Sequence, residues 1–173
     1  DYVIKLVDSW KYPKEDLKII KRDWEFINQK IKDGKAHELS EGDTFYLGAC
    51  TKGSTALKSF RDQPFNEEQA KQRAYSLKQG YVNHIIANIA QEETAIYGKI
   101  IERPEILDKV QSLEEIVILK FHPFYGKSAN QIEQELGLDL NQNAKSYFAN
   151  LTNAILGLKL GQKIEEFEKA DIQ

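Results

Sequence analysis

The side chains best suited to bind a polyanion lie in two short segments of the first half of the chain. The first segment, residues 46–54, runs from an apolar stretch into Thr51, Lys52, Gly53 and Ser54. Lysine and hydroxyl side chains beside glycine suit a backbone that must approach phosphates or the floor of a groove. The segment therefore indicates a nucleic-acid contact. The alternative is an ordinary solvated loop.

The second segment mixes basic, aromatic and hydroxyl side chains: Lys71, Arg73, Tyr75, Ser76, Lys78 and Tyr81. We expect it at the start of a helix, where free backbone N–H groups would add a phosphate contact. The alternative is an amphipathic helix whose lysines face water.

Histidine and cysteine form no comparable pattern. His37, His84 and His122 are far apart in the sequence, so a metal site built on them is not expected and a structural role is. Cys50 is the single cysteine, which excludes an internal disulfide and a Cys-cluster zinc site. We expect it to be a small buried apolar residue rather than a nucleophile.

The elements that would position the two segments follow from composition and apolar spacing. Residues 2–7 and 44–50 predict strands, and residues 77–90 predict a helix. Residues 69–75 fit either type of element. Another helix is predicted for residues 14–34, with one apolar stripe at spacings of three and four: Leu17, Ile20, Trp24, Ile27 and Ile31.

In the second half, residues 91–111 are expected to form a connector. Ser112 with Glu115, and Ser128 with Gln131, have the spacing of capping boxes and so predict two helix starts.

A third helix is predicted for residues 143–156. Its apolar side would comprise Tyr147, Phe148, Leu151, Ile155 and Leu156. Residues 166–173 predict the beginning of a strand.

The composition favours a soluble globular protein. Apolar residues make up 41% and charged residues 29% of the 173 positions, which excludes a disordered chain and a membrane protein. No cleavable leader is visible, so we expect a cytoplasmic protein. Charge is uneven: residues 1–90 hold 15 basic and 13 acidic side chains, whereas residues 91–173 hold 9 and 14.

Several motifs resemble those of a known nuclease family. They are Lys21-Arg-Asp-Trp-Glu25, residues 34–43, Tyr46-Leu-Gly-Ala-Cys-Thr-Lys-Gly53, Gln72-Arg-Ala-Tyr-Ser-Leu-Lys78, Phe124-Tyr-Gly-Lys-Ser128, residues 132–138, Lys145-Ser-Tyr-Phe-Ala149 and Leu156-Gly157. They resemble the family of the MutH mismatch-repair nickase and the Sau-type restriction endonucleases, which cleave at GATC. The resemblance is closest to the Sau-type enzymes.

The resemblance implies a domain organisation. Sau-type enzymes carry two MutH-like domains in tandem, of which the first cleaves and the second binds a further DNA site as an effector. Residues 1–90 would be the C-terminal half of the first domain, residues 91–111 a linker, and residues 112–173 the N-terminal half of the second. The absence of methionine leads us to expect a fragment of a longer protein.

The implied fold is α/β, an α+β mixed sheet of the restriction-endonuclease-like, MutH-like type, present as two partial domains. Exposed strand edges in each half would favour association. Alternatively, the two halves could complement each other in one sheet that takes strands from both sides of residue 95.

The chemistry of the family rests on an Asp…Glu-x-Lys arrangement that holds Mg²⁺ and activates water. In the first domain this motif would lie before Asp1, so no catalytic residue or metal site is expected in this chain. In the second domain the matching positions are degenerate and fall on Asn153, Glu166 and Gln173. One carboxylate in place of three should bind Mg²⁺ poorly, so this domain is expected to bind DNA without cutting it.

The family's DNA contacts also map onto named positions. The base-reading loop falls on Thr51, Lys52 and Gly53, between Cys50 and Ser54. Arg73, Tyr75, Ser76 and Lys78 match the neighbouring strand, where Ser76 replaces a methylation-sensing aromatic. Lys145 matches a DNA-contacting lysine.

These observations favour part of a Mg²⁺-dependent type II restriction endonuclease that hydrolyses duplex DNA at GATC. Its partners would be double-stranded DNA and, through bridging DNA, a second copy. This fragment alone is expected to be inactive. Two alternatives remain: a non-catalytic duplex DNA-binding module and a structural helical interaction protein.

Overall fold

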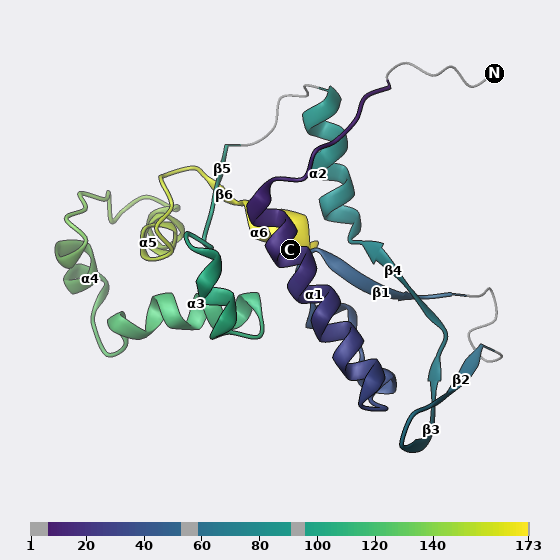
Figure 1. The fold of residues 1–173 in the computed structure, drawn as a ribbon. Coiled ribbons are helices and arrows are strands. Elements are labelled where there is room, and N and C mark those ends of the chain that lie inside the picture. The colour runs from purple at the N-terminus through teal and green to yellow at the C-terminus, as the bar shows by residue number, and fades with distance from the viewer. Residues whose placement is uncertain (1–6, 53–58, 91–95, 173) are drawn as a thin grey trace. The chain divides into compact units, whose positions relative to one another are not determined.

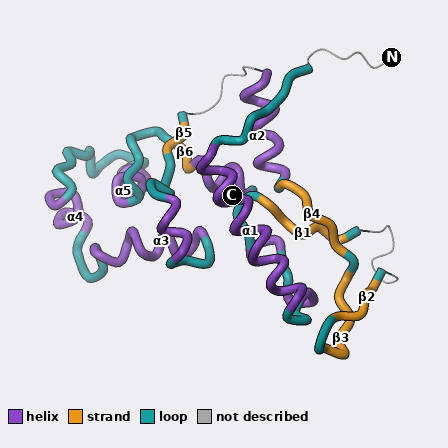
Figure 2. Tube along the Cα trace, in the orientation of Figure 1, coloured by secondary structure: helices purple, strands orange, loops and turns teal. Residues whose placement is uncertain are grey.

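A computed structural model of the chain describes residues 7–52, 59–90 and 96–172 (Figure 1). The chain divides into two compact units, which we describe separately. Unit 1 takes in Asp1–Glu92 and Glu168–Gln173, and unit 2 takes in Glu93–Phe167. The described strands form three two-stranded sheets among many helices, so the fold is mixed α+β (Figure 2). Within the described ranges, no helix combines the length and apolar character needed to cross a membrane.

The first helix of unit 1, α1 (Lys14–Lys32), forms where it was predicted but buries a different face. The buried positions are spaced by three and four: Asp16, Ile19, Asp23 and Ile27. Three members of the predicted stripe are instead at least 39% exposed: Leu17, Trp24 and Ile31. The predicted stripe was therefore wrong at these three positions and right at Ile27, because two buried carboxylates share the face that packs inward.

Asp23 shows why a carboxylate occupies that face. Its two oxygens accept hydrogen bonds from the backbone N–H groups of Phe45, Tyr46 and Leu47, at 3.0, 2.6 and 2.9 Å. Burial raises the pKa of Asp23, and these three bonds oppose the rise. The side chain thereby fixes to α1 the stretch of backbone from which the first strand starts.

The four strands of unit 1 form a long two-stranded ribbon in two parts. Strands β1 (Leu47–Thr51) and β4 (Arg73–Leu77) pair antiparallel, and so do β2 (Phe60–Gln63) and β3 (Asn66–Lys71). A strand was predicted from residue 44 and starts at Leu47. Residues 69–75, left open between helix and strand, lie in β3 and β4. The helix start expected within residues 71–78 was wrong, because this backbone pairs with β1.

Helix α2 (Gln79–Ala90) and the end of α6 (Glu165–Ala170) complete unit 1. They lie close together: a Cβ added to Gly80 would come within 2.0 Å of the Glu168 carbonyl oxygen, so only glycine fits there. The predicted strand at residues 166–173 was wrong, because α6 occupies most of this stretch.

A buried ion pair joins α1 to α6. Lys169 Nζ lies 2.8 Å from Asp16 Oδ2, and both side chains are at most 3% exposed. The Tyr81 hydroxyl of α2 donates to the same oxygen at 2.8 Å. The Lys169 ammonium also lies 5.4 Å from the ring centres of Tyr46 and Tyr81. This cluster places a satisfied charge pair in the centre of unit 1.

Unit 2 is mainly helical. Its longer helices are α3 (Leu113–Phe121), α4 (Ala129–Glu135) and α5 (Tyr147–Ile155). Strands β5 (Tyr97–Gly98) and β6 (Lys163–Ile164) form a short parallel pair, and η3 (Pro104–Asp108) and η4 (His122–Phe124) are single 3₁₀ turns. One core cluster is built on Ile132, Tyr147 and Leu151.

The two predicted caps are confirmed. The Ser112 hydroxyl accepts from Glu115 N, and Ser128 with Gln131 forms a reciprocal capping box. The third helix is confirmed in shorter form, but Phe148 is 71% exposed and does not belong to its buried side.

The stretch expected as a connector contributes to the packing of unit 2. In its described part, residues 96–111, four apolar side chains are buried: Ile100, Ile101, Leu107 and Val110. Each sheet among the described residues takes both strands from one side of residue 95. One shared sheet, the alternative arrangement of the two halves, is therefore not formed there. The strand predicted at residues 2–7 lies outside the described residues except for Val7, which is exposed.

Candidate nucleic-acid interface

The β1–β4 pair brings together the two segments that the sequence marked for DNA binding. Its register sets Thr51 opposite Arg73, Ala49 opposite Tyr75 and Gly48 opposite Ser76. Residues that are more than 20 positions apart in the sequence thus become cross-strand neighbours. On one face of the ribbon, Thr51 from the first segment and Tyr75 from the second can meet the same ligand.

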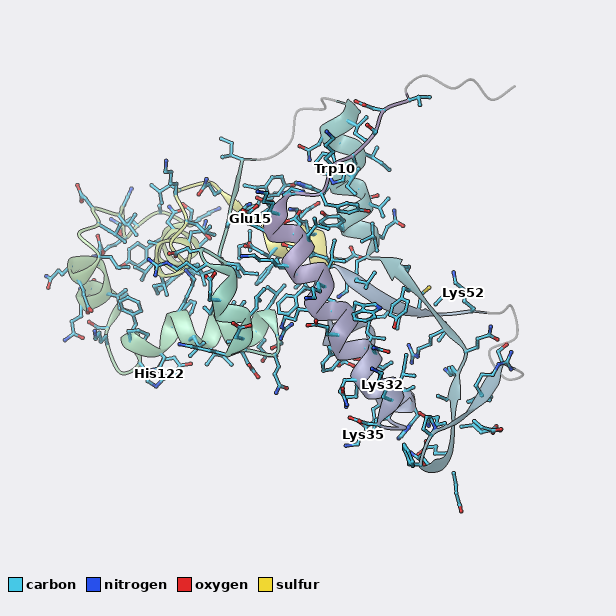
Figure 3. The ribbon with its side chains drawn as sticks, in the orientation of Figure 1. Trp10, Glu15, Lys32, Lys35, Lys52 and His122 are labelled. Carbon is cyan, nitrogen blue, oxygen red and sulfur yellow. The ribbon has the colours of Figure 1, made fainter. Side chains whose placement is uncertain are left out.

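Thr51 and Lys52 stand at the end of β1 and are exposed. The Lys52 backbone N–H donates to the Gln72 carbonyl at 2.9 Å, which anchors the main chain beneath the side chain. Figure 3 shows Lys52 at this end of the ribbon. Gly53 and Ser54, the next two candidates, lie outside the described residues. An anchored backbone with an exposed ammonium group is a suitable arrangement for a phosphate contact.

Because strand side chains alternate, the ribbon has two different faces. Cys50 and Ser76 share one face and line a pocket of about 350 Å³ in unit 1, together with Lys78 and Asp171. A hydrogen bond with the Ser76 side chain, and then the nearby Lys52 charge, lower the pKa of Cys50. Cys50 is half-buried rather than buried, so the expectation of a buried apolar residue was wrong.

Lys78 lies on the wall of this pocket. Its ammonium group donates to the Thr44 carbonyl at 2.5 Å. Burial lowers the pKa of Lys78, and the carboxylates of Asp23 and Glu41 oppose this shift. Lys78 therefore supplies positive charge at the base of the ribbon while its side chain is held by unit 1 itself.

Arg73 and Tyr75 lie on the other face. The Arg73 guanidinium donates to the carbonyls of Ala49 and Leu39, at 2.8 and 2.6 Å. Both terminal nitrogens thus bond to the protein backbone, and Arg73 ties β4 to β1 and to the turn that precedes β1. Tyr75 is 46% exposed and offers its ring to a ligand.

In unit 2, Lys145 is exposed just before α5. The degenerate catalytic positions do not form an open carboxylate site. Asn153 Nδ2 donates to the Gln162 carbonyl at 3.3 Å. Glu166 is 2% exposed, and its oxygens accept from the N–H groups of Ile100 and Ile101 at 2.9 to 3.1 Å. Gln173 lies outside the described residues.

These contacts test whether Mg²⁺ fits the degenerate positions. A magnesium ion needs several oxygen ligands with free lone pairs and usually retains water. Glu166 directs both oxygens at backbone N–H groups within the core of unit 2, and its pKa is raised by burial. The described residues at these positions do not fit a magnesium site. Across the described ranges, no group of three or more His, Cys, Asp or Glu side chains could hold a metal ion.

Sequence reasoning missed the buried carboxylates Asp16 and Asp23. The signal was present, because the two aspartates alternate with Ile19 and Ile27 at helical spacing. A search for apolar residues alone does not identify a helix face that contains aspartates. Such a face becomes buried only when distant segments supply partners for the carboxylates.

The comparisons with known proteins agree with the resemblance noted from the motifs. No protein-family model matches the chain. The chain is 41% identical over 165 residues to the type II restriction enzyme Sau3AI of Staphylococcus aureus. This match covers 91% of the chain and 32% of that enzyme, so the chain spans about a third of the length of the relative. An identity of this level, sustained over nearly the whole chain, shows that the chain is homologous to a segment of that Sau-type restriction endonuclease.

Proposed function

We propose that this chain is a DNA-binding segment of a type II restriction endonuclease that acts on duplex DNA. The observation that carries the proposal is the β1–β4 ribbon. Its register places Thr51 and Tyr75 on the same face of two neighbouring strands, and Lys52 directly follows β1. Phosphate contacts would come from Lys52 and Thr51, and base or sugar contacts from Tyr75 and the residues that follow Lys52.

The proposal assigns Arg73 and Lys78 a supporting role. Both side chains donate to carbonyls of unit 1. Their charges attract the phosphate backbone, and their hydrogen bonds hold the ribbon in shape. Lys145 would be a separate contact from unit 2, where it is exposed before α5.

Cleavage is proposed to need residues other than those described here. The parent enzyme would use Mg²⁺ and an Asp…Glu-x-Lys motif to hydrolyse DNA at GATC. The two units would be parts of two domains of restriction-endonuclease-like fold, the second of them non-catalytic. The bonds of Asn153 and Glu166 support a non-catalytic role, because they leave no open carboxylate for a metal.

A salt titration tests the DNA-binding role. Binding of the 173-residue chain to fluorescent duplexes with and without GATC is measured by anisotropy over a range of salt concentrations. Lys52→Ala should weaken binding and reduce the slope of log K against log salt by about one phosphate contact. Lys159→Ala removes an exposed charge from unit 2 and serves as the matched control. Equal affinity and slope for the parent chain and Lys52→Ala would reject the ribbon as the interface.

A cleavage assay tests the second part of the proposal. The chain, incubated with GATC-containing duplex and Mg²⁺, should leave the DNA intact while it still binds. Cleavage by the purified chain, abolished by Glu166→Gln, would show that unit 2 is catalytic and would overturn the assignment.

A further inference from the structure

The far end of the ribbon exposes one aromatic side chain. Gln63 of β2 pairs with Asn66 of β3, and Pro64 and Phe65 form the two-residue turn between them. Phe65 is 98% exposed. No apolar contact within the described residues compensates for placing a phenylalanine there, so its position calls for another explanation.

The backbone of Phe65 is also strained. Its φ is +57°, in the left-handed region that an aromatic residue rarely adopts. A turn with proline first and a positive φ second ordinarily takes glycine or asparagine at the second position. A glycine here would relieve the strain, whereas the chain presents a phenylalanine. Strain of this kind persists where the surroundings impose it, and it is common at functional sites.

The residues that follow α1 contact this turn and fix its position. Gly34, just after α1, lies so close that an added Cβ would be 1.9 Å from the Pro64 carbonyl oxygen. Asn66 Nδ2 donates to the Gly34 carbonyl at 2.9 Å, and Gln63 Oε1 accepts from Ala36 N at 2.7 Å. The turn is therefore fixed against the end of α1, and Phe65 projects from a rigid base. Figure 1 shows this hairpin beside the end of α1.

The hairpin is continuous with the proposed DNA interface. Only Gln72 separates β3 from β4, and its backbone bonds to Ser59 and Lys52, the residues next to β2 and β1. The exposed lysines Lys32 and Lys35 flank Gly34, which packs against this turn (Figure 3). A duplex that contacts Lys52 can follow the ribbon toward Phe65.

The charges around the hairpin have both signs. Arg61 and Lys71 are opposed by Asp62, Glu67 and Glu68. Two of these acids already have partners, because Asp62 accepts from Gln69 and Glu68 faces His37. General electrostatic attraction therefore does not select the ligand of Phe65. The aromatic ring must select it.

The isolation of Phe65 favours DNA over a protein partner. A stable protein interface buries about 1,000 Å² or more around an apolar core. Apart from Pro64, the neighbours of Phe65 along this hairpin are polar or charged: Arg61, Asp62, Asn66 and Glu67. A wedge between base pairs needs only one apolar ring on a narrow support.

We propose that Phe65 is an aromatic wedge that inserts between adjacent base pairs of the duplex held along the ribbon and partly unstacks them. The inference rests on the proposed function and adds a specific contact to it. Bases that give up stacking on each other would stack on the ring instead, as they do on aromatic side chains of other nucleic-acid-binding proteins.

The test uses duplexes in which 2-aminopurine, whose fluorescence rises on unstacking, replaces single bases along a GATC site. Binding of the parent chain should raise the fluorescence at one step. Phe65→Ala should abolish the rise and weaken binding about 5- to 100-fold. Its salt slope should stay unchanged, because no phosphate contact is lost. Phe65→Trp should preserve both signals.

Phe65→Gly separates the wedge from a structural role. Glycine accepts the positive φ, so this variant should melt at a higher temperature than the parent and still bind DNA as weakly as Phe65→Ala. Phe148→Ala, which removes another exposed phenylalanine from unit 2, is the control and should change neither property.

Three outcomes overturn the wedge. One is parental affinity and parental 2-aminopurine fluorescence for Phe65→Ala while Lys52→Ala loses binding, which leaves the proposed function intact. Another is a loss of self-association for Phe65→Ala at unchanged DNA affinity, which assigns the ring to a protein contact. The third is a parent chain that is folded and does not bind DNA at low salt, which removes the proposed function as well.

Discussion

The two units use their charged side chains differently. Unit 1 buries an ion pair, Lys169 with Asp16, and keeps Lys52 exposed on a ribbon. In unit 2 the ion pairs lie near the surface, as between Lys127 and Glu135. Buried pairs require other bonds to offset their desolvation, whereas surface pairs contribute little. The difference suggests that unit 1 fixes its ribbon from within, while unit 2 depends mainly on helix caps and apolar packing.

The units nevertheless share one device. In each, a buried carboxylate on a helix accepts hydrogen bonds from consecutive backbone N–H groups: Asp23 from residues 45–47 and Glu166 from residues 100–101. In unit 1 this bond set precedes the candidate DNA-binding strand. In unit 2 these hydrogen bonds use both oxygens of Glu166, the carboxylate that the family resemblance places at a degenerate metal position.

The largest expected effect concerns the buried pair. Lys169→Ala leaves Asp16 buried with only the Tyr81 hydroxyl, and should destabilise unit 1 by about 3–5 kcal/mol. Both tryptophans, Trp10 and Trp24, belong to unit 1, so urea unfolding followed by tryptophan fluorescence reports on this unit. The unit 2 control, Lys127→Ala, should cost about 0–1 kcal/mol by circular dichroism. Equal losses would erase the contrast between the units.

The next effect concerns the shared device. Asp23→Asn keeps the size of the side chain and removes one acceptor oxygen, so it should cost about 1–3 kcal/mol. Hydrogen exchange should speed up at Phe45, Tyr46 and Leu47. Glu166→Gln should accelerate exchange at Ile100 and Ile101 alone. Unchanged exchange at residues 45–47 would show that Asp23 does not hold the start of β1.

A smaller effect tests the dependence of unit 2 on its caps. Ser128→Ala removes the hydroxyl that accepts from Gln131 N and should cost about 1 kcal/mol. Ser128→Asp keeps a hydrogen-bond acceptor and should retain most of the stability that Ser128→Ala loses. Chemical unfolding of the three proteins by circular dichroism measures the difference. An unchanged midpoint for Ser128→Ala would mean that apolar packing alone holds α4.

The smallest effect is a pH trend that distinguishes the units. A hydrogen bond from Leu140 N lowers the pKa of Glu133 below its usual value of 4.5, helped by the Tyr147 hydroxyl. A carboxyl with a lowered folded pKa contributes stability above its unfolded pKa and loses it as the pH falls through the folded value. The pKa of Asp23 is raised, so its contribution has the opposite sign and declines as the pH rises through the folded value.

Below about pH 4.5 the stability that Glu133 gives to unit 2 should therefore be lost, whereas the contribution of Asp23 to unit 1, followed by tryptophan fluorescence, is retained. Glu133→Gln should flatten the acid dependence seen by circular dichroism. Simultaneous loss of both signals in the parent chain, unaffected by this substitution, would contradict the assignment.

Local interactions explain what could be predicted from sequence. The caps at Ser112 and Ser128 each depend on a residue three positions away. The helix α1 could be predicted from the periodic spacing of its apolar residues. The family resemblance marked two candidate DNA-binding segments, and pairing of β1 with β4 brings them together.

Long-range interactions explain what could not. Asp16 and Lys169 are 153 positions apart, and no local pattern shows that they meet. The same holds for the contacts of Arg73, which matches a basic position of the family and donates to the carbonyls of Ala49 and Leu39. Helix α6 stands where a strand was predicted, and in it Lys169 and Glu166 both have buried partners from distant segments.

The most direct measurement of the central claim is the salt dependence of duplex binding for the parent chain, Lys52→Ala and Lys159→Ala. The ribbon interface predicts weaker binding and a shallower log K against log salt slope for Lys52→Ala alone. Identical curves for all three proteins, or an effect confined to Lys159→Ala, would contradict it.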